Sequence, residues 1–125
     1  LGDPAAALVS YQRSAALQRR LGDRSREARA WNGAGRAYAA LERYEEAAEF
    51  HRGAAAVHRE LGDDWQLAVS LDHLADALLR SGTADRAEAG RHRAEVLRLI
   101  SAFDDPKVER MRARISAEAG SGQPG

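Results

Sequence analysis

Four histidines and one Asp-His pair are the residues of this sequence with the clearest potential for chemistry. No two histidines form the i, i+4 pair with which a helix ligates zinc, since they stand at His51, His58, His73 and His92. Asp72 and His73 place a carboxylate beside an imidazole, but the chain has no cysteine and no serine nucleophile in a recognisable setting. We therefore expect no catalytic centre and no metal site, and interpret the protein as a non-enzyme.

The motif Gly33-Ala34-Gly35 looks like the start of a dinucleotide-binding fingerprint. That fingerprint follows a strand and has a third glycine, whereas no strand pattern precedes Gly33 and the third position is Tyr38. We therefore expect no cofactor. The two glycines need another explanation, because each costs about 1 kcal/mol relative to alanine in a helix interior.

The charge balance argues against nucleic-acid and membrane partners. The 125 residues include 19 basic and 19 acidic side chains, so no net field attracts the chain to polyanions. Arginine clusters such as Arg91 and Arg93 are interleaved with acids along the chain, which is typical of solvated helix faces. No apolar run approaches the roughly 18 residues of a membrane span, and no signal peptide is visible. We expect a cytoplasmic protein, and the absence of an initial methionine suggests a piece of a longer chain.

The elements that position these residues are predicted to be helices. Apolar residues recur at three- and four-residue spacing, as in Leu71, Leu74 and Leu78. The pattern breaks at turn residues such as Gly22-Asp23 and Gly62-Asp63, whose aspartates suit the N-cap position. No segment shows strand alternation. We predict helices near 4–20, 24–40, 44–60, 64–80, 84–101 and 106–118, in one domain at 1–118 followed by a flexible tail at 119–125.

The helices recur as pairs. The tripeptide Leu-Gly-Asp occurs at 1–3, 21–23 and 61–63, and residues 1–23 align with residues 41–63 at an offset of 40. The segments 24–40 and 64–80 align at the same offset. Self-similarity at such a period indicates stacked supersecondary units. The sequence therefore predicts an all-α fold of repeated helix pairs.

The stretch 30–54 resembles a tetratricopeptide repeat. That motif has a large, a small and an aromatic residue in its first helix, which Trp31, Gly35 and Tyr38 supply, and its second helix is matched by Tyr44, Ala47 and Ala54. The period exceeds the usual length of about 34 residues. This long variety is similar to repeats in the C-terminal parts of actinobacterial AfsR-type transcriptional regulators and in Pins-type adaptors. The resemblance implies a right-handed helical-hairpin solenoid that binds other proteins.

The resemblance also implies separate roles for the two glycines. Gly35 takes the small-residue position where the first helix of a pair crosses the second, so close packing offsets its low helix propensity. Gly33 falls on the inner, concave face of the solenoid. There it either reflects sequence drift at an exposed site or leaves room for the backbone of a partner.

The same resemblance places the partner-binding groove on the concave face that the first helices form. The residues expected there are Arg29, Asn32, Gly33, Arg36, Asp72, His73, Asp76 and Arg112. In one interpretation, Arg36 and Arg112 neutralise the two aspartates within the scaffold. In the other, Asn32 holds the backbone of a bound peptide and the aspartates select basic side chains.

The expected function is protein–protein interaction. The chain would bind a peptide or helix of a protein partner in its concave groove, as a module of a larger bacterial regulatory protein. The alternative is self-association, in which the end helices make a homodimer that holds a parent regulator together.

Overall fold

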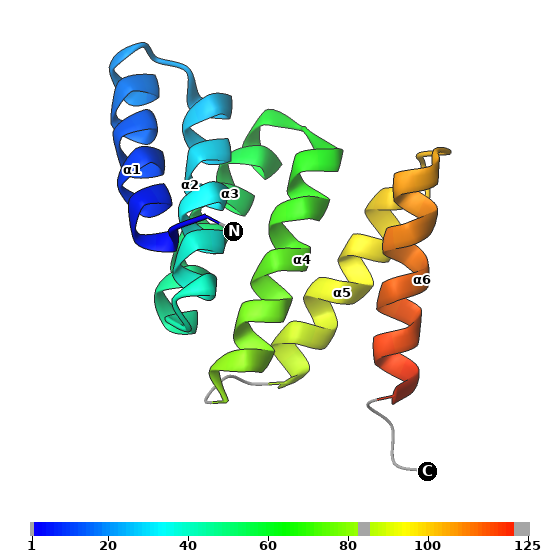
Figure 1. Cartoon of the computed structure of the whole chain (residues 1–125). Coiled ribbons are helices and arrows are strands. Elements are labelled where there is room, and N and C mark those ends of the chain that lie inside the picture. Colours follow the sequence, from blue (N-terminus) through cyan, green and yellow to red (C-terminus); the bar gives the residue numbers. More distant parts are fainter. Residues whose placement is uncertain (1, 83–85, 122–125) are drawn as a thin grey trace.

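The structure, a computed structural model, describes residues 2–82 and 86–121. These residues form six α-helices and no strand: α1 (Pro4–Arg20), α2 (Arg24–Ala40), α3 (Tyr44–Leu61), α4 (Asp64–Ser81), α5 (Arg86–Ile100) and α6 (Pro106–Ser121). Successive helices run antiparallel and lie side by side from α1 to α6 (Figure 1). The predicted all-α fold of sequential hairpins in a solenoid-like arrangement is confirmed.

The predicted helix bounds differ from the observed ones mainly near the C-terminus. α1 and α2 have the predicted bounds, and α3 and α4 are one residue longer. The helix predicted at 84–101 is α5, which is described from Arg86, because residues 83–85 lie outside the described part of the chain. α6 continues to Ser121, so the first three residues of the predicted tail are helical, and residues 122–125 lie outside the described part. None of the described helices is long and apolar enough to span a membrane.

Aspartates begin four of the helices. Each carboxylate accepts a hydrogen bond from a backbone N–H of the following first turn, as in Asp3 to Ala5, Asp23 to Arg26, Asp63 to Gln66 and Asp105 to Lys107. Gly22 and Gly62 precede two of them with φ values of 74° and 70°, a left-handed conformation that glycine adopts without strain. The repeated Gly-Asp pair therefore ends one helix and begins the next.

The core lies around α4. Leu71 and Leu74 are almost fully buried and pack with Val96 of α5 and Ile115 of α6.

α2 and α3 meet instead through alanines, including the fully buried Ala28 and Ala54. Small side chains let two helices approach closely, which explains the high alanine content of this half of the chain.

Alternate helices are also linked, which arranges the helices in two layers. α2, α4 and α6 are joined through Asn32–Ser70 and Asp72–Arg114 contacts. α3 and α5 are joined by the ion pairs Arg52–Glu88 and Arg59–Glu95. We call the surface formed by α2, α4 and α6 the even-helix face, since it carries the residues that the sequence places in the binding groove.

Candidate interaction face

Asn32 is buried in a polar network that joins α2, α3 and α4. Its Nδ2 donates to Ser70 Oγ over 2.7 Å, and Ser70 Oγ donates to the backbone carbonyl of Gln66 over 2.9 Å. Asn32 Oδ1 lies 2.9 Å from His51 Nδ1. Because the amide oxygen can only accept, His51 carries its proton on Nδ1. The prediction that Asn32 is available to the backbone of a partner is therefore wrong, since its amide is used inside the scaffold.

His51 explains the second glycine of α2. A Cβ atom at Gly35 would lie 2.6 Å from Cε1 of the His51 ring, so only glycine leaves room for this imidazole where α2 crosses α3. The predicted crossing role of Gly35 is confirmed. His51 stacks on His73 of α4, with ring centroids 5.1 Å apart. Burial lowers the pKa of His51 to about 3, and the charges of His73 and Arg36 add to the shift.

Gly33 is buried, which contradicts its predicted exposure. A Cβ atom at this position would lie 2.7 Å from Cζ of Tyr11 and closer still to other atoms of the same ring. The Tyr11 ring of α1 therefore lies against the backbone of α2 at Gly33. Both interpretations of Gly33 assumed an open surface, and both are wrong because Tyr11 occupies the space that the missing side chain leaves.

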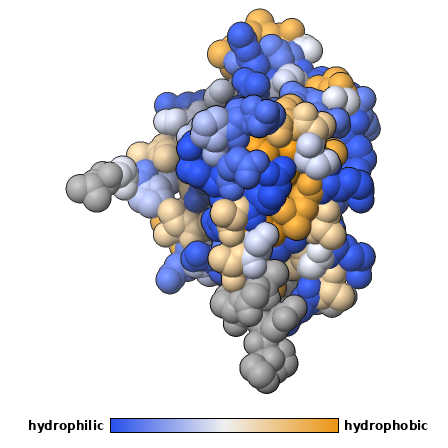
Figure 2. Space-filling model, turned by 90° about the vertical axis from the view of Figure 1, so that its right-hand side faces the viewer, coloured by the Kyte–Doolittle hydropathy of each residue, from blue (hydrophilic) through white to orange (hydrophobic). Residues whose placement is uncertain are grey.

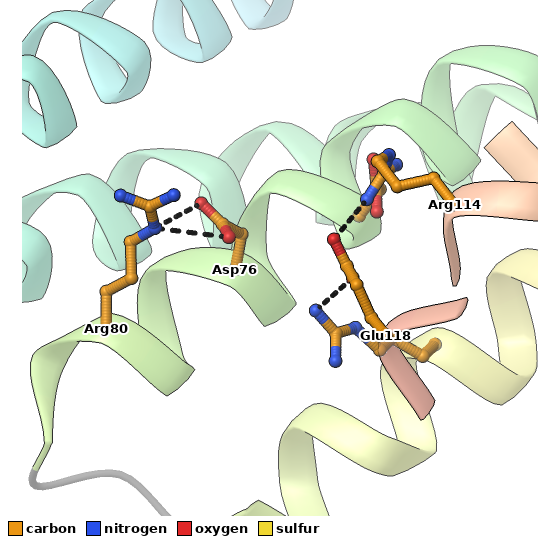
Figure 3. Close-up of polar contacts among 6 residues, drawn as sticks. Asp76, Arg80, Arg114 and Glu118 are labelled. Carbon is orange, nitrogen blue, oxygen red and sulfur yellow. Dashed lines mark hydrogen bonds and ion pairs between the residues drawn. The ribbon is translucent and has the colours of Figure 1, made fainter. Parts of the chain in front are cut away.

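The two aspartates of α4 are neutralised within the scaffold. Arg114 Nη2 donates to the buried Asp72 carboxylate, and Asp76 pairs with Arg80 one turn away at 3.2 Å. Figure 3 shows Arg80 facing Asp76 along α4 and Arg114 pointing toward Glu118 on α6. The buried Asp72 is therefore not free to select basic groups of a partner, whereas Asp76 remains 48% exposed beside Arg80.

The arginines that neutralise the aspartates differ from those predicted. Arg112 pairs with Glu109 within α6, and Arg36 makes no ion pair with any described residue. The fixed offset of 40 fails because the turn before α6 is longer. Counting from the capping aspartates corrects the register, since Asn32, Asp72 and Arg114 each stand nine residues after Asp23, Asp63 or Asp105. The caps are therefore the signal that would have identified Arg114.

His73 is partly buried between these groups. Burial is the main cause that lowers its pKa, opposed by the nearby Asp72 and Asp76 carboxylates. The His73 ring stacks on the His51 ring, so we assign His73 a packing role.

A groove between α1 and α2 was not predicted. It consists of two adjoining cavities, of about 300 Å³ and 260 Å³, that share Tyr11 as a wall. Arg36 and Gly33 line the first cavity, and Arg29 lines the second. We call these two cavities and the Tyr11 ring between them the α1–α2 groove.

The polar groups of the α1–α2 groove lack partners. Arg29 and Arg36 are exposed, and neither makes an ion pair or hydrogen bond with a described residue. Within the same part of the chain, the Tyr11 hydroxyl makes no hydrogen bond, and Gln18 Oε1 is buried without one. Of the eight residues predicted to bind a partner, Arg29 and Arg36 are thus the two that present free charge beside a cavity.

No family model matches the sequence, and a comparison with curated proteins finds no match. Among the described residues, no group of three or more histidine, aspartate or glutamate side chains is arranged to hold a metal ion. The interpretation of this face therefore rests on its geometry.

Proposed function

We propose that the chain is a tetratricopeptide-type interaction module that binds a segment of another protein, and that it belongs to a larger bacterial regulatory protein of the AfsR type. The assignment to this repeat class is supported by the Trp31, Gly35 and Tyr38 pattern and by capping aspartates 40 residues apart at Asp23 and Asp63. Repeat modules of this kind use extended surfaces to bind partners.

The observation that carries the proposal is the α1–α2 groove. Several charged groups of α4 and α6 are paired with one another, such as Asp72 with Arg114, whereas Arg110 of α6 is exposed, makes no ion pair with a described residue and lines neither cavity of the groove. In the groove, two arginines and a tyrosine hydroxyl stand beside cavities with no partner among the described residues. Polar groups that converge on a cavity without being used by the scaffold are typical of a binding site.

Substituting Ser14 tests the proposal without changing charge. Ser14 lines one of the two cavities, whereas Ser10 is exposed on the same helix and lines neither. Tagged Ser14→Trp should fail to retain an actinobacterial protein that wild type and Ser10→Trp both retain. Circular dichroism melts would confirm that both variants fold. Equal retention by all three proteins would contradict binding in the groove.

One observation favours the alternative of self-association. Val9 and Leu17 of α1 and Leu21, which caps its C-terminal end, remain 46, 50 and 68% exposed. Figure 2 shows a further band of hydrophobic surface on the side of the molecule where α5 and α6 lie. Exposed apolar surface at both end helices is the feature expected of a chain that associates with itself.

The alternative makes a separate prediction. If α1 mediates a homodimer, light scattering should show a mass that rises with protein concentration and that falls to the monomer in Leu17→Lys. A constant monomeric mass across concentrations would exclude this alternative. Ser14→Trp should leave the mass unchanged in either case, because Ser14 faces the groove.

A further inference from the structure

We propose that the α1–α2 groove recognises an acidic peptide in the polyproline II conformation, with two carboxylate side chains three residues apart. This inference rests on the proposed function and specifies the chemistry of its ligand. It reverses the sequence-based expectation of a basic peptide, because the free charges of this surface are arginines.

The positive charge of the groove favours a negatively charged ligand. Arg29 and Arg36 carry no ion-pair partner among the described residues, and a third arginine, Arg26, lies 3.5 Å from the Asp23 carboxylate. The one carboxylate that lines either cavity, Asp3, is engaged as the cap of α1 by the N–H groups of Ala5 and Ala6. Arginine binds carboxylates through paired hydrogen bonds, so an anionic partner is favoured.

The spacing of the arginines determines the spacing of the acids. Arg29 and Arg36 are seven residues apart on α2, which places them on one side of the helix about 10.5 Å apart along its axis. In a polyproline II peptide, residues i and i+3 point to the same side and stand about 9.3 Å apart. In a β-strand the same two residues point to opposite sides. Of the two extended conformations, the threefold one therefore matches the spacing of the arginines.

Tyr11 supports the same conformation. Its ring separates the two cavities, so a ligand must cross an aromatic surface between the two arginines. Prolines pack well on aromatic rings, and the backbone carbonyls of a polyproline II peptide are free to accept hydrogen bonds. The Tyr11 hydroxyl has no hydrogen-bond partner among the described residues, so it is free to donate to such a carbonyl.

Two synthetic peptides of equal composition test the spacing. The first carries Glu-Pro-Pro-Glu and the second carries Pro-Glu-Glu-Pro, each with capped ends and the same glycine-serine flanks. Isothermal titration calorimetry of the whole chain at low salt should show the first peptide binding about tenfold more tightly, because only its carboxylates reach both arginines. Equal affinity for the two peptides, or no binding of either, would overturn the inference.

A charge-reversal pair tests the residues. Arg29→Glu with Arg36→Glu should weaken binding of the first peptide by about tenfold or more. The matched control is Arg91→Glu with Arg110→Glu, which changes net charge equally at two exposed arginines without a described ion pair. Unchanged binding in the Arg29 and Arg36 variant, or equal loss in the control, would overturn the assignment.

The outcome separates this inference from the proposed function. If Ser14→Trp abolishes capture of a partner while the Arg29 and Arg36 reversal does not, the groove binds proteins but does not read acidic side chains. If Ser14→Trp has no effect on capture, the groove is not the binding site and the proposed function fails.

Discussion

The two glycines of α2 face rings that differ in their freedom to move. Gly35 faces His51, which is buried and held by Asn32, whereas Gly33 faces Tyr11, a partly exposed ring at the molecular surface. A methyl group at position 35 therefore has no space to enter. A methyl group at position 33 can displace the tyrosine, and the gain in helix propensity offsets part of the cost.

We predict that Gly35→Ala lowers the free energy of unfolding by about 1–3 kcal/mol, the usual cost of overpacking. Gly33→Ala should change it by less than about 1 kcal/mol, because displacement of Tyr11 and improved helix propensity oppose each other. Urea denaturation of both variants measures the difference. Equal losses would show that Tyr11 is as firmly held as His51.

Two buried histidines, His51 and His58, and the partly buried His73 make the stability depend on pH. Burial lowers the pKa of His51, His58 and His73 below the value of 6.5 for a free imidazole. As pH falls below 6.5, the unfolded chain therefore binds protons that the folded chain does not, and stability decreases.

With its pKa of about 3, His51 alone should make the fold about 2 kcal/mol less stable at pH 5 than at pH 7. Denaturant titrations at half-unit pH steps measure this slope. His92, whose side chain is 22% exposed and lies 3.1 Å from Glu88, provides the comparison through His92→Gln. A free energy of unfolding that stays constant from pH 7 to pH 5 would contradict the claim that these imidazoles remain neutral in the folded chain.

At the scale of the helices, the sequence predicted the elements better than their contacts. Caps such as Asp23 and Asp63 are local signals, so helix ends could be predicted to within one residue over the first four helices. The partner of Asp72 depends on the length of the turn before α6, which shifts the register of that helix. Asn32 is buried against His51, which is nineteen residues away in the sequence, and no local sequence pattern predicts this contact.

The Arg59–Glu95 ion pair between α3 and α5 should contribute more to stability than the Arg24–Glu60 pair, which lies at the ends of α2 and α3. Arg59 bonds both oxygens of Glu95, whose side chain is only 17% exposed, whereas Glu60, the partner of Arg24, is 63% exposed. Double-mutant cycles should give a coupling of about 0.5–1 kcal/mol for Arg59 with Glu95 and close to zero for Arg24 with Glu60. Equal couplings would contradict the role assigned to burial.

Acid should remove the Arg59–Glu95 coupling. The hydrogen bond from Arg59 is the main cause that lowers the pKa of Glu95 below its usual value of 4.5. The stabilisation is therefore present above pH 4.5 and is lost as the carboxylate is protonated at lower pH. Repeating the cycle at low pH measures this loss, because the cycle cancels the histidine contribution that all four proteins share.

At the scale of the whole molecule, stability should be greatest in the middle. α2, α3 and α4 bury many residues between neighbours, whereas α1 buries only Ala15 and the described side chains of α6 bury only Val108 and Ile115. Units at the end of a repeat array have one neighbour and open first. Amide hydrogen exchange should therefore be slowest in α2, α3 and α4. Slow exchange extending through α1 would instead indicate that its exposed leucines are covered by a second chain.

Whole-molecule function was the part least accessible from the sequence. The repeat pattern indicated which helix faces to consider, but the free charges could be identified only once the pairs of Asp72 and Asp76 were known. The α1–α2 groove depends on Tyr11 lying over Gly33, a contact between residues that no periodicity connects. Tertiary contacts therefore determine which of the predicted site residues remain available to bind a partner.

Hydrogen exchange with and without a captured partner tests the central claim most directly. If the partner binds in the α1–α2 groove, amides around Tyr11, Ser14, Arg29 and Arg36 should gain protection, while those of α5 and α6 stay unchanged. The unliganded chain measured at several concentrations provides the control for self-association. Protection confined to α5 and α6, or to the side of α1 that carries Val9 and Leu17, would contradict the account.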